Sequence, residues 1–79
     1  MRDIEMIATF KNGKITPYRL RLENENGDLQ VIQIRHVKYQ EEYKREKKIK
    51  FCVKAAVNGV DRELLLWFHI QTCNWYLAN

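Results

Sequence analysis

The sequence contains no serine, one proline and only three glycines among its 79 residues. Without serine there is no Ser-His-Asp catalytic arrangement, and three isolated glycines form no phosphate-binding loop. Low-complexity linkers are also missing. We therefore expect one domain, covering residues 1–79, with a small core that buries ~60% of the surface of the unfolded chain.

Long hydrophobic runs are absent as well. The longest run spans residues 64–68 and is far too short to cross a membrane as a helix. No long apolar segment follows the N-terminal residues, as a secretory signal would require. These absences predict a cytoplasmic protein that does not contact membranes.

Only two cysteines occur, Cys52 and Cys73, which is too few for a disulfide framework. With His36 and His69 they are the residue types of a zinc site, but no local ligand pair such as C-x2-C is present. We therefore predict no metal and no other cofactor. Cys73 is interpreted as a small buried hydrophobic residue, and the histidines as polar strand residues.

Catalysis by Cys52 is the remaining enzymatic possibility. Cys52 lies between Lys50 and Lys54 in the sequence, and nearby cations lower a thiol pKa. No partner residues with definable roles accompany it, however. The sequence therefore predicts a protein that is not an enzyme and has no evident small-molecule substrate.

Two Asn-Gly pairs, Asn12-Gly13 and Asn58-Gly59, lie between runs of alternating apolar and polar residues. This pattern is typical of β-hairpins, because both turn residues must adopt positive φ. We expect six short antiparallel strands and an all-β fold. A small barrel, or a meander close to one, would remove the exposed edges of a flat sheet.

The second hairpin has a well-defined predicted register. A two-residue turn at Asn58-Gly59 places Phe51 opposite Leu66, with apolar partners throughout this face. The same register places Ile49 opposite Phe68, Val53 opposite Leu64, Lys50 opposite Trp67 and Lys54 opposite Glu63.

In the first hairpin, a two-residue turn does not match the apolar and polar faces of the two strands. A two-residue turn would set Met6 against Arg19, so we predict a three-residue loop at 11–13 with a bulge at Gly13. This loop pairs Met6 with Tyr18, Ile4 with Leu20 and Glu5 with Arg19. Pro17 indicates an edge or a bulge nearby.

The remaining segments are read by composition. Residues 24–28 form a loop, and residues 29–39 form a strand with apolar residues in both phases, as in a strand that is buried on both faces or interrupted by a bulge. Residues 40–48 form a charged connector that could form one or two helical turns through the i, i+4 pair Glu41 and Arg45, although nine residues make a marginal helix without packing. A last strand spans residues 72–77.

The segments 15–23 (ITPYRLRLE) and 61–63 (DRE) through 72–77 (TCNWYL) are similar to those of a family of short uncharacterised bacterial β-rich proteins. The similarity covers most of the chain, and its motifs are structural rather than catalytic. The resemblance implies a small bacterial β protein and transfers no activity.

The net charge of +4 is concentrated between residues 35 and 54, which hold eight Lys or Arg and three Glu. Such a basic segment predicts sequence-nonspecific binding of nucleic acid through phosphate contacts, with bases stacking on aromatic strand residues. The alternative without a binding role is a solvated, charged connector that keeps the protein soluble. The candidate binding residues are Lys44, Arg45, Lys47, Lys48, Lys50, Lys54 and Trp67.

A protein-binding or self-associating module is the alternative prediction. Leu65 and Trp67 point away from the core in the predicted register, and exposed apolar groups on one face often mark an interface. A covering connector, or a second sheet packed on this face, would equally bury them. The candidate interface residues are Leu65, Trp67, His69 and Tyr76.

Overall fold

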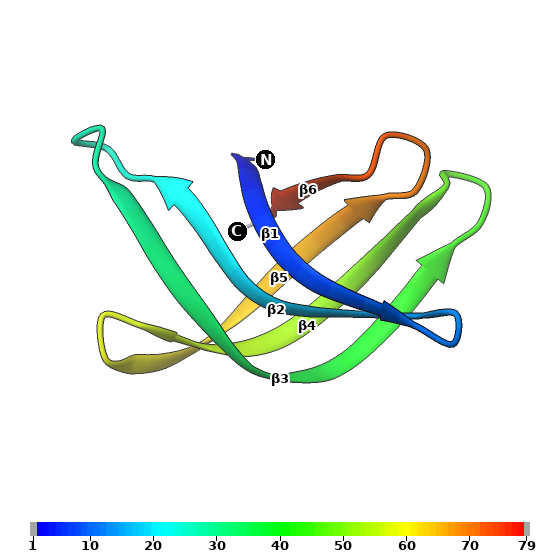
Figure 1. Cartoon of the computed structure of the whole chain (residues 1–79), viewed down its shortest axis with the longest axis horizontal. Helices are drawn as coiled ribbons and strands as arrows, with labels where there is room; N and C mark the ends of the chain where they lie inside the picture. The colour runs from blue at the N-terminus through cyan, green and yellow to red at the C-terminus, as the bar shows by residue number, and fades with distance from the viewer. Residues whose placement is uncertain (1, 79) are drawn as a thin grey trace.

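The computed structural model describes residues 2–78 and confirms an all-β fold without helices in this range. Neighbouring strands pair antiparallel in chain order, and β1 pairs with β6 to close a six-stranded barrel (Figure 1). Three hairpin turns lie at one end of the barrel and two at the other. The strands are β1 (Arg2–Lys11), β2 (Lys14–Glu23), β3 (Leu29–Tyr43), β4 (Lys48–Val57), β5 (Val60–His69) and β6 (Asn74–Leu77).

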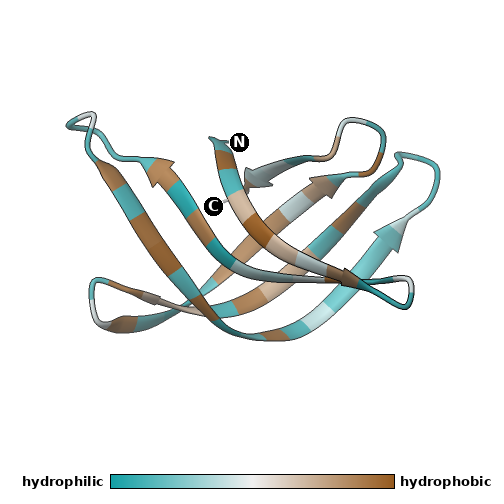
Figure 2. Ribbon diagram, viewed as in Figure 1, coloured by the Kyte–Doolittle hydropathy of each residue, from teal (hydrophilic) through white to brown (hydrophobic). Residues whose placement is uncertain are grey.

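The core follows from the alternation of the strands. Apolar and polar residues alternate along most strands (Figure 2), so one face of each strand fills the barrel. No polar or charged residue among residues 2–78 is buried. The buried cluster comprises Leu20, Leu22, Ile32, Ile34, Ile49, Phe51, Val53, Ala55, Leu64, Leu66, Phe68, Trp75 and Leu77.

The β4–β5 hairpin has the predicted register throughout. Asn58 and Gly59 form a two-residue turn with φ of 52° and 79°, as a right-twisted hairpin requires. Phe51 lies opposite Leu66, and both are fully buried. The outward pairs Lys50–Trp67 and Lys54–Glu63 are also as predicted.

The predicted register of the first hairpin is wrong. The turn at Asn12-Gly13 has two residues, and the extra residue is Tyr18, which forms a bulge within β2. Beyond this bulge Met6 pairs with Leu20 and Glu5 with Arg21. A bulge in β2 restores the apolar face as well as a longer turn does, because either shifts the phase by one residue.

The predicted helical character of the connector is also wrong. β3 continues to Tyr43, and only residues 44–47 form the turn before β4. Two bulges, at Arg35 and Lys38, change the phase of β3 as it bends around the barrel. Pairing with β4 therefore determines the structure of a segment whose local sequence favours a helix.

The last strand begins later than predicted, at Asn74. Cys73 belongs to the preceding turn, with φ of 59°, and its side chain is exposed. The interpretation of Cys73 as a buried residue is thus wrong, and Cys52 is the buried thiol.

Candidate nucleic-acid interface

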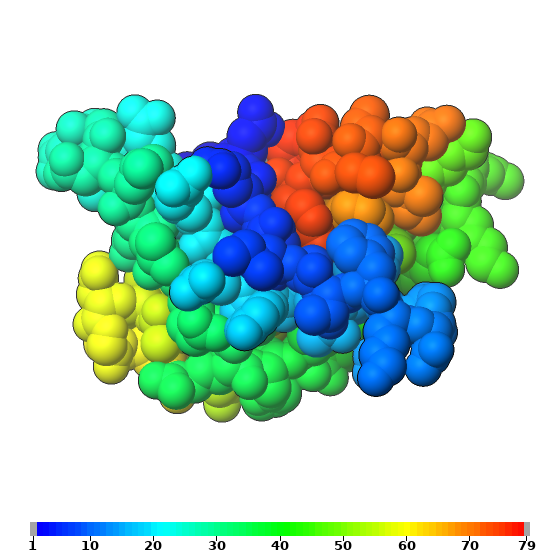
Figure 3. Space-filling view, in the orientation of Figure 1, coloured from blue at the N-terminus to red at the C-terminus, as the bar shows by residue number. Residues whose placement is uncertain are grey.

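The basic residues 44–48 lie at one end of the barrel. Residues 44–47 form a turn in which Lys47 has φ of 56°. This turn lies beside the turn at residues 70–73 (Figure 3), because the Ile70 N–H donates a hydrogen bond of 3.0 Å to the Lys47 carbonyl oxygen. This hydrogen bond joins the backbones of the two turns.

Four cations at this end of the barrel have no carboxylate partner among the described residues. Lys44, Arg45 and Lys47 are exposed and Lys48 is half-buried. Within residues 2–78, none of these four forms a salt bridge. We call residues 44–47 the basic turn.

Aromatic side chains adjoin the basic turn on the outer surface of the barrel. Lys50, Trp67 and Tyr76 are successive cross-strand partners on β4, β5 and β6. Lys48 Nζ lies 4.2 Å from the centroid of the Trp67 ring, and the Tyr43 ring meets Trp67 edge-on at 5.3 Å. We call this surface the cation–aromatic face, formed by Tyr43, Lys48, Lys50, Trp67, His69 and Tyr76.

The cation that contacts the Trp67 ring is not the residue directly across from it. Lys50 is directly opposite Trp67, but its ammonium turns toward β3, where its Nζ lies 3.3 Å from Glu41 Oε1. Lys48, diagonal to Trp67, covers the indole instead. A long side chain reaches diagonal neighbours easily, so register alone does not decide the cation–π partner.

Tyr43 organises this corner of the face. Its hydroxyl donates a hydrogen bond of 2.9 Å to Glu41 Oε1. Together with Lys50, this bond holds the pKa of the Glu41 carboxyl below its ordinary value. The Tyr43 hydroxyl and the Glu41 carboxylate in turn raise the pKa of Lys50. Tyr43 was not among the predicted site residues. Residues 40–48 were read as partly helical, so the strand-like alternation of Tyr39, Glu41 and Tyr43 was not recognised.

His69 and Tyr76 complete the face at its other side. Their ring centroids are 4.6 Å apart, and the Tyr76 hydroxyl oxygen accepts a 3.4 Å hydrogen bond from the Asn74 amide. His69 Nε2 is buried without a hydrogen-bond partner among the described residues.

Lys54 does not join the basic turn. It lies six residues from Lys48 along β4, roughly 20 Å at strand spacing, and is opposite Glu63 and His36. Of the predicted cations, the structure thus groups Lys44, Arg45, Lys47 and Lys48, with Lys50 adjoining in an ion pair.

Cys52 has none of the properties of a reactive thiol. It points outward between Tyr39 and Leu65, yet it is fully buried. Burial, and then Glu63, raise the pKa of the Cys52 thiol, whereas a nucleophile needs a lowered one. Burial and a raised thiol pKa therefore do not favour catalysis by Cys52.

The candidate metal ligands are dispersed. Cys52 is buried in β4, Cys73 is in the β5–β6 turn, His36 is in β3 and His69 ends β5. No three His, Cys, Asp or Glu side chains within residues 2–78 are placed to share a metal ion.

Leu65 and Trp67 point outward as predicted, and both are half-buried. The most exposed large apolar residues lie elsewhere, with Phe10 at 64% and Leu29 at 62% of full exposure. Within the described chain, Trp67 is covered by Tyr43 and Lys48, which both belong to the segment 40–48 predicted as the connector, so the covering-connector alternative is confirmed for Trp67, and no second sheet packs on it. An interface of the Leu65/Trp67 face stays a prediction.

Comparison of the chain with protein-family models, curated proteins and solved structures finds no match. The resemblance to a family of short bacterial proteins therefore stays a prediction. The part of the chain that the structure describes includes no helix suited to crossing a membrane.

Proposed function

We propose that this protein binds single-stranded nucleic acid, without sequence preference, across the basic turn and the cation–aromatic face. The observation that carries this proposal is the position of Trp67. Its ring lies on the outer surface between Lys48 and Tyr43, at the end of the barrel that carries the basic turn. Lys48 and the three cations of that turn have no salt-bridge partner within residues 2–78.

Stacking supplies the first part of the binding energy. A base that stacks on Trp67 would replace the Lys48 ammonium, which is held there only by a cation–π contact. Base–aromatic stacking contributes ~1–3 kcal/mol per base and tolerates any base. Tyr76, directly across from Trp67, offers a second ring on the next strand.

Phosphate contacts supply the second part. Lys48, released from the indole, and the exposed Lys44, Arg45 and Lys47 can follow the backbone of the bound strand. Such contacts release counterions and carry no sequence information. Glu41 is already engaged by Lys50 and Tyr43, which limits its repulsion of phosphate.

Fluorescence anisotropy with a labelled single-stranded oligonucleotide tests this proposal. Replacing Lys44, Arg45, Lys47 and Lys48 by Gln should weaken binding and lower the magnitude of the salt slope by about 0.7 per lost contact, the value for a single strand. The matched control replaces four exposed cations elsewhere, Lys14, Arg19, Lys54 and Arg62, and loses the same charge. Equal losses in both variants would mean that only net charge matters and would refute this site.

The alternative function is protein contact through the Leu65/Trp67 face, with His69 and Tyr76 at its side. The shared outward direction of Leu65 and Trp67 favours it. An apolar interface loses little affinity as salt is added, whereas phosphate contacts weaken steeply. Salt-insensitive association that requires Trp67 would therefore favour this alternative.

A further inference from the structure

The ladder that closes the barrel is short. β1 pairs with β6 only at Arg2, Ile4 and the residue between them, because β6 begins at Asn74. Beyond Ile4, no strand within residues 2–78 pairs with this side of β1, although β2 pairs with the other side as far as Lys11. Residues 5–11 are therefore a free strand edge, whose backbone groups can accept another strand.

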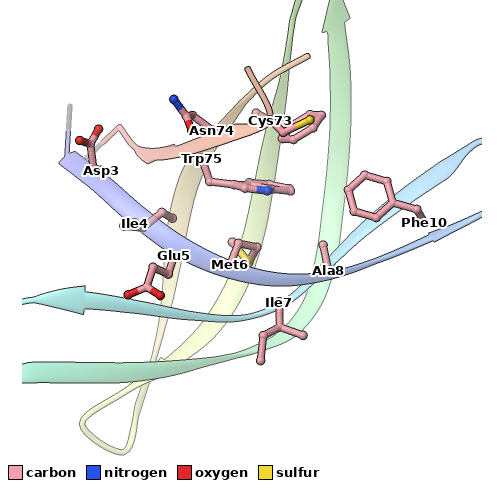
Figure 4. A pocket seen from close by; sticks show the side chains of 11 residues that line it. Asp3, Ile4, Glu5, Met6, Ile7, Ala8, Phe10, Cys73, Asn74 and Trp75 are labelled. Carbon is pink, nitrogen blue, oxygen red and sulfur yellow. The ribbon is translucent and has the colours of Figure 1, made fainter. Parts of the chain in front are cut away.

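A groove of about 810 Å³, lined by apolar side chains and by Asp3, Glu5 and Asn74, borders this free edge. Figure 4 shows Ile4, Met6 and Ala8 on the face of β1 that borders the groove, with Trp75 across from them and Phe10 at the far end. Glu5 and Ile7 also line the groove, but their side chains extend from the opposite face of β1.

The exposed Phe10 side chain indicates most clearly that one chain alone does not cover this groove. It is 64% exposed and meets the core residue Phe68 edge-on, with ring centroids 6.2 Å apart. Met6 and Ala8 are only partly buried although they pack on the core. Large apolar groups left open beside an unpaired edge indicate a surface that another strand covers.

The free edge is complementary to itself. Ala8 is the centre of residues 5–11, so two antiparallel copies that use the whole edge place Ala8 opposite Ala8. Glu5, whose carboxylate pairs with Arg21 within the chain, then also lies opposite Lys11 at both ends, which is a favourable cross-strand pair. Met6 lies opposite Phe10 on the groove side of the strands.

Other registers fit less well. A shift by one residue sets the charged Glu5 opposite the apolar Phe10 and mismatches both faces. A shift toward the N-terminus requires Ile4, which β6 already occupies. A shift toward the C-terminus leaves Glu5 without Lys11.

We propose that the protein forms a two-fold symmetric dimer in which residues 5–11 of two copies pair as antiparallel β-strands. Such an interface is isologous, so each copy contributes the same residues. The dimer uses a different surface from the cation–aromatic face and does not depend on the proposed nucleic-acid binding.

Lys11→Glu tests the dimer against monomer stability. Within one chain Lys11 lies opposite Lys14, so Lys11→Glu relieves a like-charge pair and should raise the melting temperature of the monomer. In the dimer it sets Glu against Glu5 at both ends and should weaken association by about tenfold or more. Lys14→Glu is the matched control, because it relieves the same pair on β2 but leaves the dimer edge unchanged.

A charge swap makes the test specific. Glu5→Lys alone should also weaken dimerisation, whereas an equimolar mixture of Glu5→Lys and Lys11→Glu chains restores opposite charges at both ends. Sedimentation velocity over a wide concentration range should show dimers for the parent, for Lys14→Glu and for the mixture. A parent that stays monomeric, or Lys11→Glu chains that associate as strongly as the parent, would overturn the proposal.

Discussion

Lys38 Nζ lies 2.6 Å from Glu63 Oε2, although Lys38 is in β3, Glu63 is in β5 and β4 runs between them. Lys38 can cross β4 because it is the extra residue of a bulge. The other bulge residue of β3 makes the equivalent contact, since Arg35 Nε lies 3.0 Å from Asp61 Oδ1. The Lys38–Glu63 pair lies beside the Cys52 thiol and helps to cover it.

The two thiols should therefore differ strongly in reactivity. In the native protein, a thiol reagent at neutral pH should modify Cys73 rapidly and Cys52 only after unfolding, since Cys52 is buried and its pKa is raised. A colorimetric thiol assay should count one fast thiol, and two in denaturant. Cys73→Ser should abolish the fast phase, and a persistent fast phase in that variant would contradict the burial of Cys52.

Acid should destabilise the protein partly through Glu63. The Lys38 ammonium holds the pKa of the Glu63 carboxyl below its ordinary value, so this stabilisation is present above the ordinary carboxyl pKa and is lost as the pH falls through the lowered one. Melting temperatures should fall between about pH 5 and pH 3. Glu63→Gln should flatten this dependence, whereas Glu25→Gln, in the β2–β3 loop, should leave it unchanged. Identical profiles for both variants would count against the crossing pair.

Phe51 should be a large contributor to stability. Its side chain is fully buried and its ring lies 5.3 Å from Trp75. Phe51→Ala should lower the free energy of unfolding by ~3–5 kcal/mol, measured by urea denaturation. Tyr18→Ala is the control, because Tyr18 is half-exposed at the β2 bulge. A near-neutral Phe51→Ala would show that the strand phase is reversed.

The two tryptophans separate binding from folding. Trp67→Ala should lower affinity for single-stranded DNA by about five- to a hundredfold, the equivalent of one stacked base, with a small change in melting temperature. Trp75→Ala, in the core, should lower the melting temperature strongly. If Trp67→Ala instead destabilised the fold and left association unchanged, Trp67 would be a structural residue only.

The hairpins show how far the sequence specifies this fold. For β4–β5, both faces constrain the register, so Phe51 opposite Leu66 could be predicted. For β1–β2, alternation shows that one residue is extra but not which strand carries it, and the three-residue loop and the Tyr18 bulge restore the same faces. They differ in register: the structure pairs Met6 with Leu20 and Glu5 with Arg21, whose side chains approach to 2.8 Å, and not with Tyr18 and Arg19.

The candidate site was predicted in part for similar reasons. Alternation placed Lys50 and Trp67 together on the outer surface, because both lie in well-patterned strands. Tyr43 was missed because residues 40–43 have a helix-like charge pattern, which pairing with β4 overrides. The free edge of β1 depends on where β6 begins. Cys73, just before β6, has a positive φ although it is not a glycine, so the sequence does not mark this turn.

The most direct test of the proposed function is the salt dependence of single-stranded DNA binding by the unaltered protein. Four phosphate contacts from the basic turn and Lys48 predict that the logarithm of the affinity falls linearly with the logarithm of salt concentration, with a slope of about −3. Absence of binding at low salt, or an affinity that does not change with salt, would contradict the account.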